Sequence, residues 1–181
     1  NRPHLRPAQR RHRPLLGQDV AAFKTDFGEG APVDALYADG RDGTKVHNVF
    51  PLLYNRAVFE TVRKERGEGI VWARSGYAGS QRYPVHWLGD TQCTFGGMAG
   101  ALRGGLSLSM SGIPFWSHDI GGFFNPGRFP DPPDRDLYIR WAQWGLLSSH
   151  SRFHGIHARE PWHYGEEALR IVREFARLRY R

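Results

Sequence analysis

The feature of this sequence that most constrains its fold is a recurring pattern in which a short apolar run ends abruptly in polar residues. The run at 20–23 (Val-Ala-Ala-Phe) predicts a buried strand; Lys24 and Asp26 follow it, and Gly28 then allows the backbone to turn. Asp26 is therefore expected where a strand leaves the core, with Phe27 shielding its carboxylate from water. Taken alone, a strand end whose aspartate caps a turn fits equally well.

The same pattern returns along the chain. Further strands are expected at 70–73, 83–87, 109–116 and 151–155, and polar groups lie at or just beyond their ends: Arg74, Asp90, His118, Asp119 and His154. Apolar periodicity predicts a first helix that starts at about Val49 or Leu52 and ends at Arg66, and further helices at 94–104, 134–147 and 168–178. The segment 30–48 is expected to be a polar loop. Asp134 is placed to cap the third helix and Gly67 to end the first.

Strands that alternate with helices predict an α/β fold built on a parallel sheet. No strand is followed by the G-x-G-x-x-G pattern of a dinucleotide-binding sheet. In a (β/α)8 barrel all strand ends converge on one mouth, where catalytic groups sit. The chain supplies about five such units, so we expect the C-terminal part of a (β/α)8 TIM barrel, about strands 4 to 8. We assign residues 19–181 to this partial catalytic domain.

The charge distribution argues against a nucleic-acid-binding module. The formal net charge is +7, but residues 1–18 alone carry five arginines and no acidic residue, whereas 19–165 contain equal numbers of basic and acidic side chains. A nucleic-acid surface normally carries its charge on the folded body, so that function is the weaker alternative. We expect 1–18, rich in Arg and Pro, to be disordered.

Length and cysteine content bound the environment. No run approaches the roughly 18 apolar residues of a membrane helix, so no membrane association is expected. The single cysteine, Cys93, cannot form an internal disulfide, and no signal-peptide pattern is present. We therefore expect a cytoplasmic protein, and because the sequence begins with Asn1 instead of Met we also expect that the natural N-terminus is missing.

Asp26 and Asp90 are the candidate catalytic pair. They follow strands two apart in the expected order, and neighbouring strands lie about 5 Å apart, so their carboxylates are expected to face each other across a sugar ring. Paired carboxylates, one shielded and one solvated, are what glycoside hydrolysis needs. A metal site is a weaker hypothesis because His118 and Asp119 are adjacent rather than at ligand spacing. No G-x-S-x-G nucleophile elbow is present.

Six stretches closely resemble glycoside hydrolase family 31, and within it the bacterial α-xylosidases and their α-glucosidase relatives. They are Lys-Thr-Asp-Phe-Gly-Glu at 24–29, Ala-Arg-Ser at 73–75, Pro-Val-His-Trp-Leu-Gly-Asp at 84–90, Leu-Arg-Gly-Gly-Leu-Ser at 102–107, Phe-Trp-Ser-His-Asp-Ile-Gly-Gly-Phe at 115–123 and Leu-Leu-Ser-Ser-His-Ser-Arg-Phe-His-Gly at 146–155. The resemblance covers 19–162 in the family's order and spacing, and 1–18 fall outside it.

The resemblance implies a retaining α-glycosidase with Asp26 as nucleophile and Asp90 as general acid/base. It also implies a sugar-binding subsite lined by Lys24, Arg74, Trp87, Asp119, Phe123 and His154. Trp87 and Phe123 also fit a purely structural role in the core. His118 is expected to support a neighbouring residue rather than to bind sugar.

The resemblance implies an α-linked oligosaccharide or glycoside as substrate and neither a metal nor an organic cofactor. It leaves open the choice between xylose and glucose and a homo-oligomeric state of the full-length enzyme. Because the first three barrel strands are absent, we expect the 181 residues alone to have little activity. An inactive carbohydrate-binding remnant is the alternative.

Overall fold

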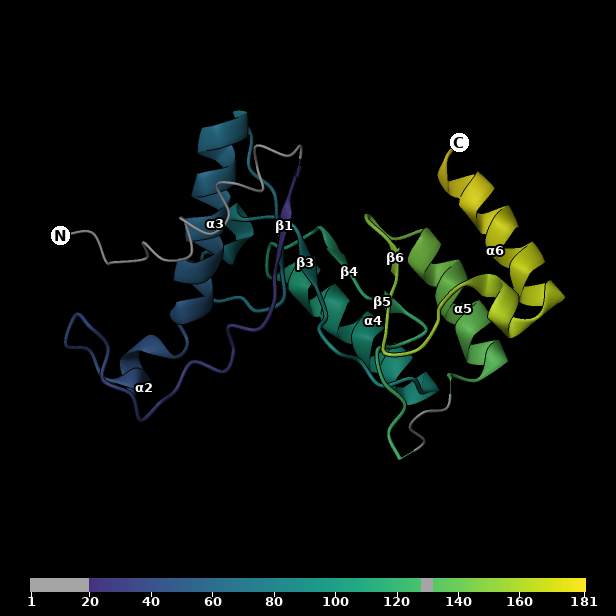
Figure 1. The fold of residues 1–181 in the computed structure, drawn as a ribbon, viewed down its shortest axis with the longest axis horizontal. Coiled ribbons are helices and arrows are strands. Elements are labelled where there is room, and N and C mark those ends of the chain that lie inside the picture. Colours follow the sequence, from purple (N-terminus) through teal and green to yellow (C-terminus); the bar gives the residue numbers. More distant parts are fainter. Residues whose placement is uncertain (1–19, 128–131) are drawn as a thin grey trace. The chain divides into compact units, whose positions relative to one another are not determined.

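The computed structural model of the protein describes residues 20–127 and 132–181. The expected disorder of 1–18 therefore lies outside the described residues. The chain divides into two compact units, residues 1–86 and residues 87–181, and most of their helices and strands are labelled in Figure 1.

The first unit is built on parallel strands with helix α3 (Phe50–Arg66) between them in sequence. β1 (Phe23–Thr25) pairs in parallel with β2 (Val71–Ala73) in the register Phe23↔Val71, and Ala73 pairs in parallel with His86 of β3 (His86–Trp87). The short helix α2 (Gly43–Val46) lies in the expected polar loop, and a 3-10 turn, η1 (Ser80–Arg82), precedes β3.

Helix α3 forms where its sequence predicts. Pro51 in its first turn fits a position that needs no amide donor, and Gly67 ends the helix in a left-handed conformation with φ of 86°. Its buried face includes Val58 and Val62, which pack with Val71 and Ala73 of β2 to form the core of this unit.

The second unit contains three helices and three short strands. In order they are α4 (Phe95–Met110), β4 (Trp116–Ser117), β5 (Asp119–Ile120), α5 (Arg135–Leu146), β6 (Arg152–Phe153), the 3-10 turn η2 (Pro161–Tyr164) and α6 (Glu166–Arg179). β5 and β6 pair in parallel, with Asp119 opposite Arg152. As expected, Asp134 caps α5, its side chain accepting from the Asp136 and Leu137 amides.

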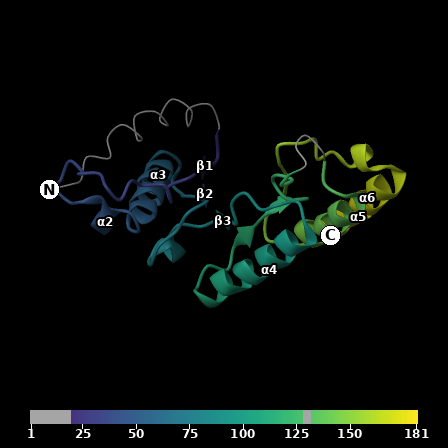
Figure 2. The ribbon, with the colours of Figure 1, turned by 90° about the horizontal axis from the view of Figure 1, so that it is seen from below.

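The main core of the second unit lies where α5 and α6 run side by side (Figures 1 and 2). Ile120, Ala142, Ala168 and Val172 are buried in it. The ring of Tyr138 stacks on η2's Tyr164 at a centroid distance of 3.7 Å. This packing fixes the position of β5 beneath α5.

Two sequence-based expectations for this unit are wrong. The strand expected at 109–116 is reduced to Trp116–Ser117, because α4 continues through Gly104 and Gly105 to Met110. A Cβ on Gly105 would lie 2.2 Å from the Trp116 ring, so this glycine allows close packing instead of ending the helix. The apolar periodicity of 94–104 also predicts that Phe95 and Leu102 face inward, but both are exposed on α4.

Candidate active site

In the first unit, Asp26 lies directly after β1 between two cations. Lys24 Nζ lies 2.6 Å from Asp26 Oδ2, and Arg74 Nη1, from the residue after β2, lies 3.4 Å from Asp26 Oδ1. The Phe27 amide also donates to Oδ1 at 3.0 Å. The parallel pairing of β1 with β2 brings these side chains to one edge of the sheet.

These contacts keep the Asp26 carboxylate ionised. Burial alone raises its pKa, but the hydrogen bonds from Lys24 and the Phe27 amide, the charge of Lys24 and the hydrogen bond from Arg74 outweigh burial. The pKa of Asp26 therefore lies below its usual value. An ionised and partly exposed carboxylate is the form that a nucleophile requires.

Arg74 is shared between Asp26 and a second carboxylate. Its Nε lies 2.8 Å from Glu29 Oε1, and its guanidinium lies 4.8 Å from the centre of the Phe27 ring. The expectation that Phe27 shields Asp26 is not met, because Phe27 is 65% exposed and its ring lies against Arg74. The positive φ of 57° at Phe27 carries the chain away from the strand direction after Asp26.

A buried asparagine on α3 ties the ends of β1 and β2 together. Asn55 Oδ1 accepts from Thr25 Oγ1 at 2.7 Å, and Asn55 Nδ2 donates to Ser75 O at 2.8 Å. Ser75 Oγ in turn donates to Phe27 O at 2.7 Å. This network holds the backbone on both sides of Asp26. Asn55 was missed in the sequence, where a polar residue on the apolar face of a predicted helix was the only indication.

In the second unit, Asp119 is fully buried and forms an ion pair with Arg152. Arg152 Nε lies 2.7 Å and Arg152 Nη2 lies 2.6 Å from Asp119 Oδ1. The Arg152 guanidinium also lies 5.2 Å from the centre of the Trp87 ring, which is 1% exposed. Asp119 and Trp87, two predicted subsite residues, therefore both contact Arg152, which was not predicted from the sequence. The only sequence signal for Arg152 was its position two residues before His154, in a stretch that resembles the family.

His118 belongs to a closed hydrogen-bond network and not to an open surface. Its Nδ1 accepts from Trp141 Nε1 at 2.7 Å, its Nε2 lies 3.2 Å from Ser148 Oγ, and its ring stacks on Trp144 at 3.6 Å. Burial, followed by the charge of His150, lowers the pKa of His118 to about 3. The ring is therefore neutral and supports the strand that carries Asp119, in keeping with its expected role.

Phe123 and His154 are also brought together. Their ring centres lie 5.5 Å apart, and the Ile156 amide donates to Phe123 O at 3.0 Å. Buried Arg159 fixes the same loops, because its Nη2 donates to Gly122 O at 2.6 Å. Arg159 was not predicted, and nothing in the sequence pattern distinguished it from surface arginines.

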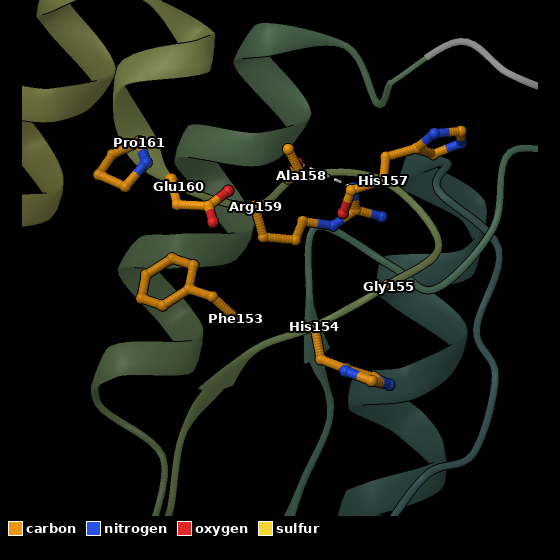
Figure 3. Close-up of a pocket in the computed structure, with 8 residues that line it drawn as sticks. All are labelled: Phe153, His154, Gly155, His157, Ala158, Arg159, Glu160 and Pro161. Atoms are coloured by element: carbon orange, nitrogen blue, oxygen red, sulfur yellow. Dashed lines mark hydrogen bonds between the residues drawn. The ribbon is translucent and has the colours of Figure 1, made fainter.

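A pocket of about 290 Å³ adjoins His154 (Figure 3). Figure 3 shows the side chain of Phe153, the last residue of β6, and that of His154, the next residue, on different sides of the chain. The pocket is lined by Phe153, His154, Gly155, His157, Ala158, Arg159, Glu160 and Pro161.

Asp90 is exposed in the loop after β3, where Gly89 adopts a positive φ of 69°. It belongs to the second unit, whereas Asp26, Lys24 and Arg74 belong to the first. The structure thus forms three groupings of predicted residues: Lys24 with Asp26 and Arg74, Trp87 with Asp119 through Arg152, and Phe123 with His154.

Within residues 20–127 and 132–181, no group of three or more His, Cys, Asp or Glu side chains is arranged to hold a metal ion. No helix in these ranges combines the length and apolar character that crossing a membrane requires.

Comparison with known families gives a match over most of the chain. The model of the glycosyl hydrolases family 31 TIM-barrel domain matches residues 6–181. The match extends beyond the range 19–162 at both ends and includes residues 6–18. It confirms the α/β class and the TIM-barrel domain expected from the sequence.

Two curated relatives are named as α-xylosidases. The chain is 46% identical over 164 residues to an alpha-xylosidase from Emericella nidulans, covering 88% of this chain and 20% of that protein. It is 43% identical over 175 residues to alpha-xylosidase XylQ from Lactiplantibacillus pentosus, covering 89% of this chain and 21% of that protein. The chain thus spans about a fifth of the length of these relatives.

Two solved structures share the fold. A family 31 sulfoquinovosidase from E. rectale, in complex with an aza-sugar inhibitor, matches with a TM-score of 0.81 at 26% identity, covering 94% of this chain and 28% of that chain. A cycloalternan-degrading enzyme from Trueperella pyogenes, in complex with a covalent intermediate, matches with a TM-score of 0.77 at 29% identity, covering 90% of this chain and 24% of that chain.

Proposed function

Because the chain belongs to glycoside hydrolase family 31, we propose that the full-length protein is a retaining α-glycosidase that releases terminal α-linked xylose or glucose. The observation that carries the proposal is the Asp26 carboxylate, which stands at the end of β1 with Lys24 at 2.6 Å and a lowered pKa. The names of the two α-xylosidase relatives favour xylose. The covalent intermediate of the cycloalternan-degrading enzyme supports a two-step mechanism.

In the first step, Asp26 attacks the anomeric carbon while Asp90 donates a proton to the departing glycosidic oxygen. The carbon–oxygen bond to the aglycone breaks and an ester between Asp26 and the sugar forms. In the second step, Asp90 takes a proton from water, the water oxygen attacks the anomeric carbon, and the ester breaks to release the sugar. Two inversions give net retention.

The side chains assigned to the sugar-binding subsite suit a sugar. In the proposed subsite, Lys24, Arg74 and His154 offer hydrogen-bonding groups to hydroxyls, and Phe123 offers apolar surface to the ring. Asp119 and Trp87 are buried in the structure and belong to the subsite through their contacts with Arg152. Lys24 and Arg74 also stabilise Asp26 as the leaving carboxylate of the second step, since both cations already contact its oxygens.

Substitution in the full-length protein tests the two roles. Asp26→Ala should lower kcat on every substrate by on the order of 10⁴-fold, because no other group forms the ester. Asp90→Ala should impair substrates with poor leaving groups far more than activated aryl α-xylosides, which need little protonation. Asp39→Ala is the matched control, since this aspartate is exposed and pairs with Arg41 in a loop. Equal losses on both substrate types for Asp90→Ala would contradict its role.

Covalent trapping tests the nucleophile directly. A 5-fluoro-α-xylosyl fluoride should accumulate as an ester on the peptide that contains Asp26, detectable by mass spectrometry. We also expect the carboxyl groups of Asp26 and Asp90 to lie about 5–5.5 Å apart in an experimental structure of the full-length enzyme. A label on another residue, or a separation above about 9.5 Å, would remove the assignment.

A further inference from the structure

Asp119 and Arg152 are joined twice, through the backbone and through their side chains. They are register partners in the parallel pair β5–β6 (Figure 1). Arg152 Nε donates to Asp119 Oδ1 at 2.7 Å, and Arg152 Nη2 lies 2.6 Å from the same oxygen as part of the ion pair. One hydrogen bond from a rigid guanidinium, with a second of its nitrogens at ion-pair distance from the same oxygen, fixes that oxygen in position more firmly than one flexible ammonium would.

The Asp119–Arg152 ion pair is largely buried, so removing one partner leaves the other charge buried without its counterion. The Asp119 side chain has no exposed surface and that of Arg152 is only 15% exposed. A buried carboxylate that loses its cation either takes up a proton or moves toward water. The orientation of Asp119 therefore depends on Arg152.

Arg152 also contacts Trp87, a second predicted residue of the sugar-binding subsite. Its guanidinium carbon lies 5.2 Å from the centre of the Trp87 ring, within the range of a cation–π interaction. Trp87 is itself buried, so Arg152 packs against one face of the indole. One side chain thus contacts a carboxylate on β5 and an indole on β3.

We propose that Arg152 is a positioning residue of the sugar-binding subsite, which holds the Asp119 carboxylate and the Trp87 ring in one fixed arrangement. The proposal rests on the proposed function, because it takes Asp119 and Trp87 as members of the sugar-binding subsite. Arg152 acts through these two residues and needs no contact with the substrate.

Kinetics of the full-length enzyme, expressed per site titrated with the fluorinated xylosyl fluoride, test the proposal. Arg152→Met should lower kcat/KM per titrated site by on the order of a hundredfold. Arg152→Lys should recover only part of this loss, because lysine restores the positive charge but not the planar guanidinium group. Arg152→Met combined with Asp119→Asn should lose much less than the product of the two single losses, since each removes the same interaction.

The titration separates positioning from a purely structural role. A residue needed only for folding would lower the concentration of titratable sites and leave kcat/KM per site unchanged, and that result would overturn the proposal. Independent, multiplicative losses for the two substitutions would also overturn it. Arg170→Met is the control, because Arg170 is exposed on α6 and pairs with Glu174. If the wild-type enzyme neither hydrolyses α-xylosides and α-glucosides nor takes the label, the proposed function itself fails.

Discussion

At the scale of single residues, Lys24 sets the ionisation of Asp26. Lys24→Met removes both a hydrogen bond and a positive charge that lower the Asp26 pKa, so the carboxyl keeps its proton to a higher pH. The acid limb of the kcat/KM profile on an aryl α-xyloside should move to higher pH in the full-length enzyme. Lys45→Met is the control, because Lys45 pairs with Asp42 in the polar loop. An unmoved acid limb would show that Lys24 does not govern the essential carboxylate.

His118 gives a second prediction at this scale, on stability. Its pKa is lowered to about 3 in the folded protein against about 6.5 in the unfolded chain, so the unfolded state binds more protons between these values. The stability that His118 contributes is complete above about pH 6.5 and falls with decreasing pH by at most about 1.4 kcal/mol per pH unit. The difference in Tm between wild type and His118→Gln should therefore narrow from pH 7 to pH 5. Ser148→Ala keeps the ring and should show no such narrowing.

At the scale of elements, glycines on two helices should respond oppositely to alanine. A Cβ on Gly145 of α5 would lie 2.4 Å from Ile120 Cγ1, so Gly145→Ala should cost about 1–3 kcal/mol by pushing α5 away from β5. Gly104 of α4 meets no atom within 4 Å, so Gly104→Ala should stabilise the protein by about 0.5–1 kcal/mol through helix propensity. Thermal unfolding of the two variants gives the comparison, and a stabilising Gly145→Ala would contradict this packing.

The elements also show what the sequence could and could not predict. The end of helix α3 was predicted at Arg66, as observed, because Gly67 ends it, and its start was predicted within two residues because its apolar face is regular. The predicted end of helix α4, at residue 104, was six residues early, because the helix continues to Met110 and the Trp116 ring packs over Gly105. That packing joins residues distant in sequence, and local pattern carries no information about it.

The sequence likewise predicted some residues of the candidate site and not others. The strand-end pattern and the matched stretches pointed to Lys24, Asp26, Arg74, Trp87, Asp119, Phe123 and His154, and the structure groups these around three centres. The sequence did not predict Asn55, Arg152 and Arg159, which hold these residues or their backbone in place, because their hydrogen-bond partners lie on other elements. Their role depends on burial and on hydrogen bonds across the fold, which a single sequence does not display.

At the scale of the whole molecule, we expect a polypeptide of these 181 residues to associate and to lack normal turnover. Among the described strands, β1 pairs only with β2 and β6 only with β5, so each has an open edge. On α4, Leu106 and Met110 are 54% and 90% exposed. Light scattering across a range of concentrations and assays with aryl α-xyloside and α-glucoside test this, and Leu106→Lys should reduce association. A monomer with a sharp thermal transition and full turnover would contradict it.

The pairing of Asp119 with Arg152 has a consequence for the order of assembly. During synthesis the carboxylate emerges 33 positions before the guanidinium that neutralises it. Until β6 arrives, burying Asp119 is unfavourable, so this part of the molecule has reason to stay open. A slip of one residue between β5 and β6 would turn Arg152 to the opposite face and leave the acid unneutralised. The ion pair between Asp119 and Arg152 therefore forms only when β6 has paired with β5 in the native register.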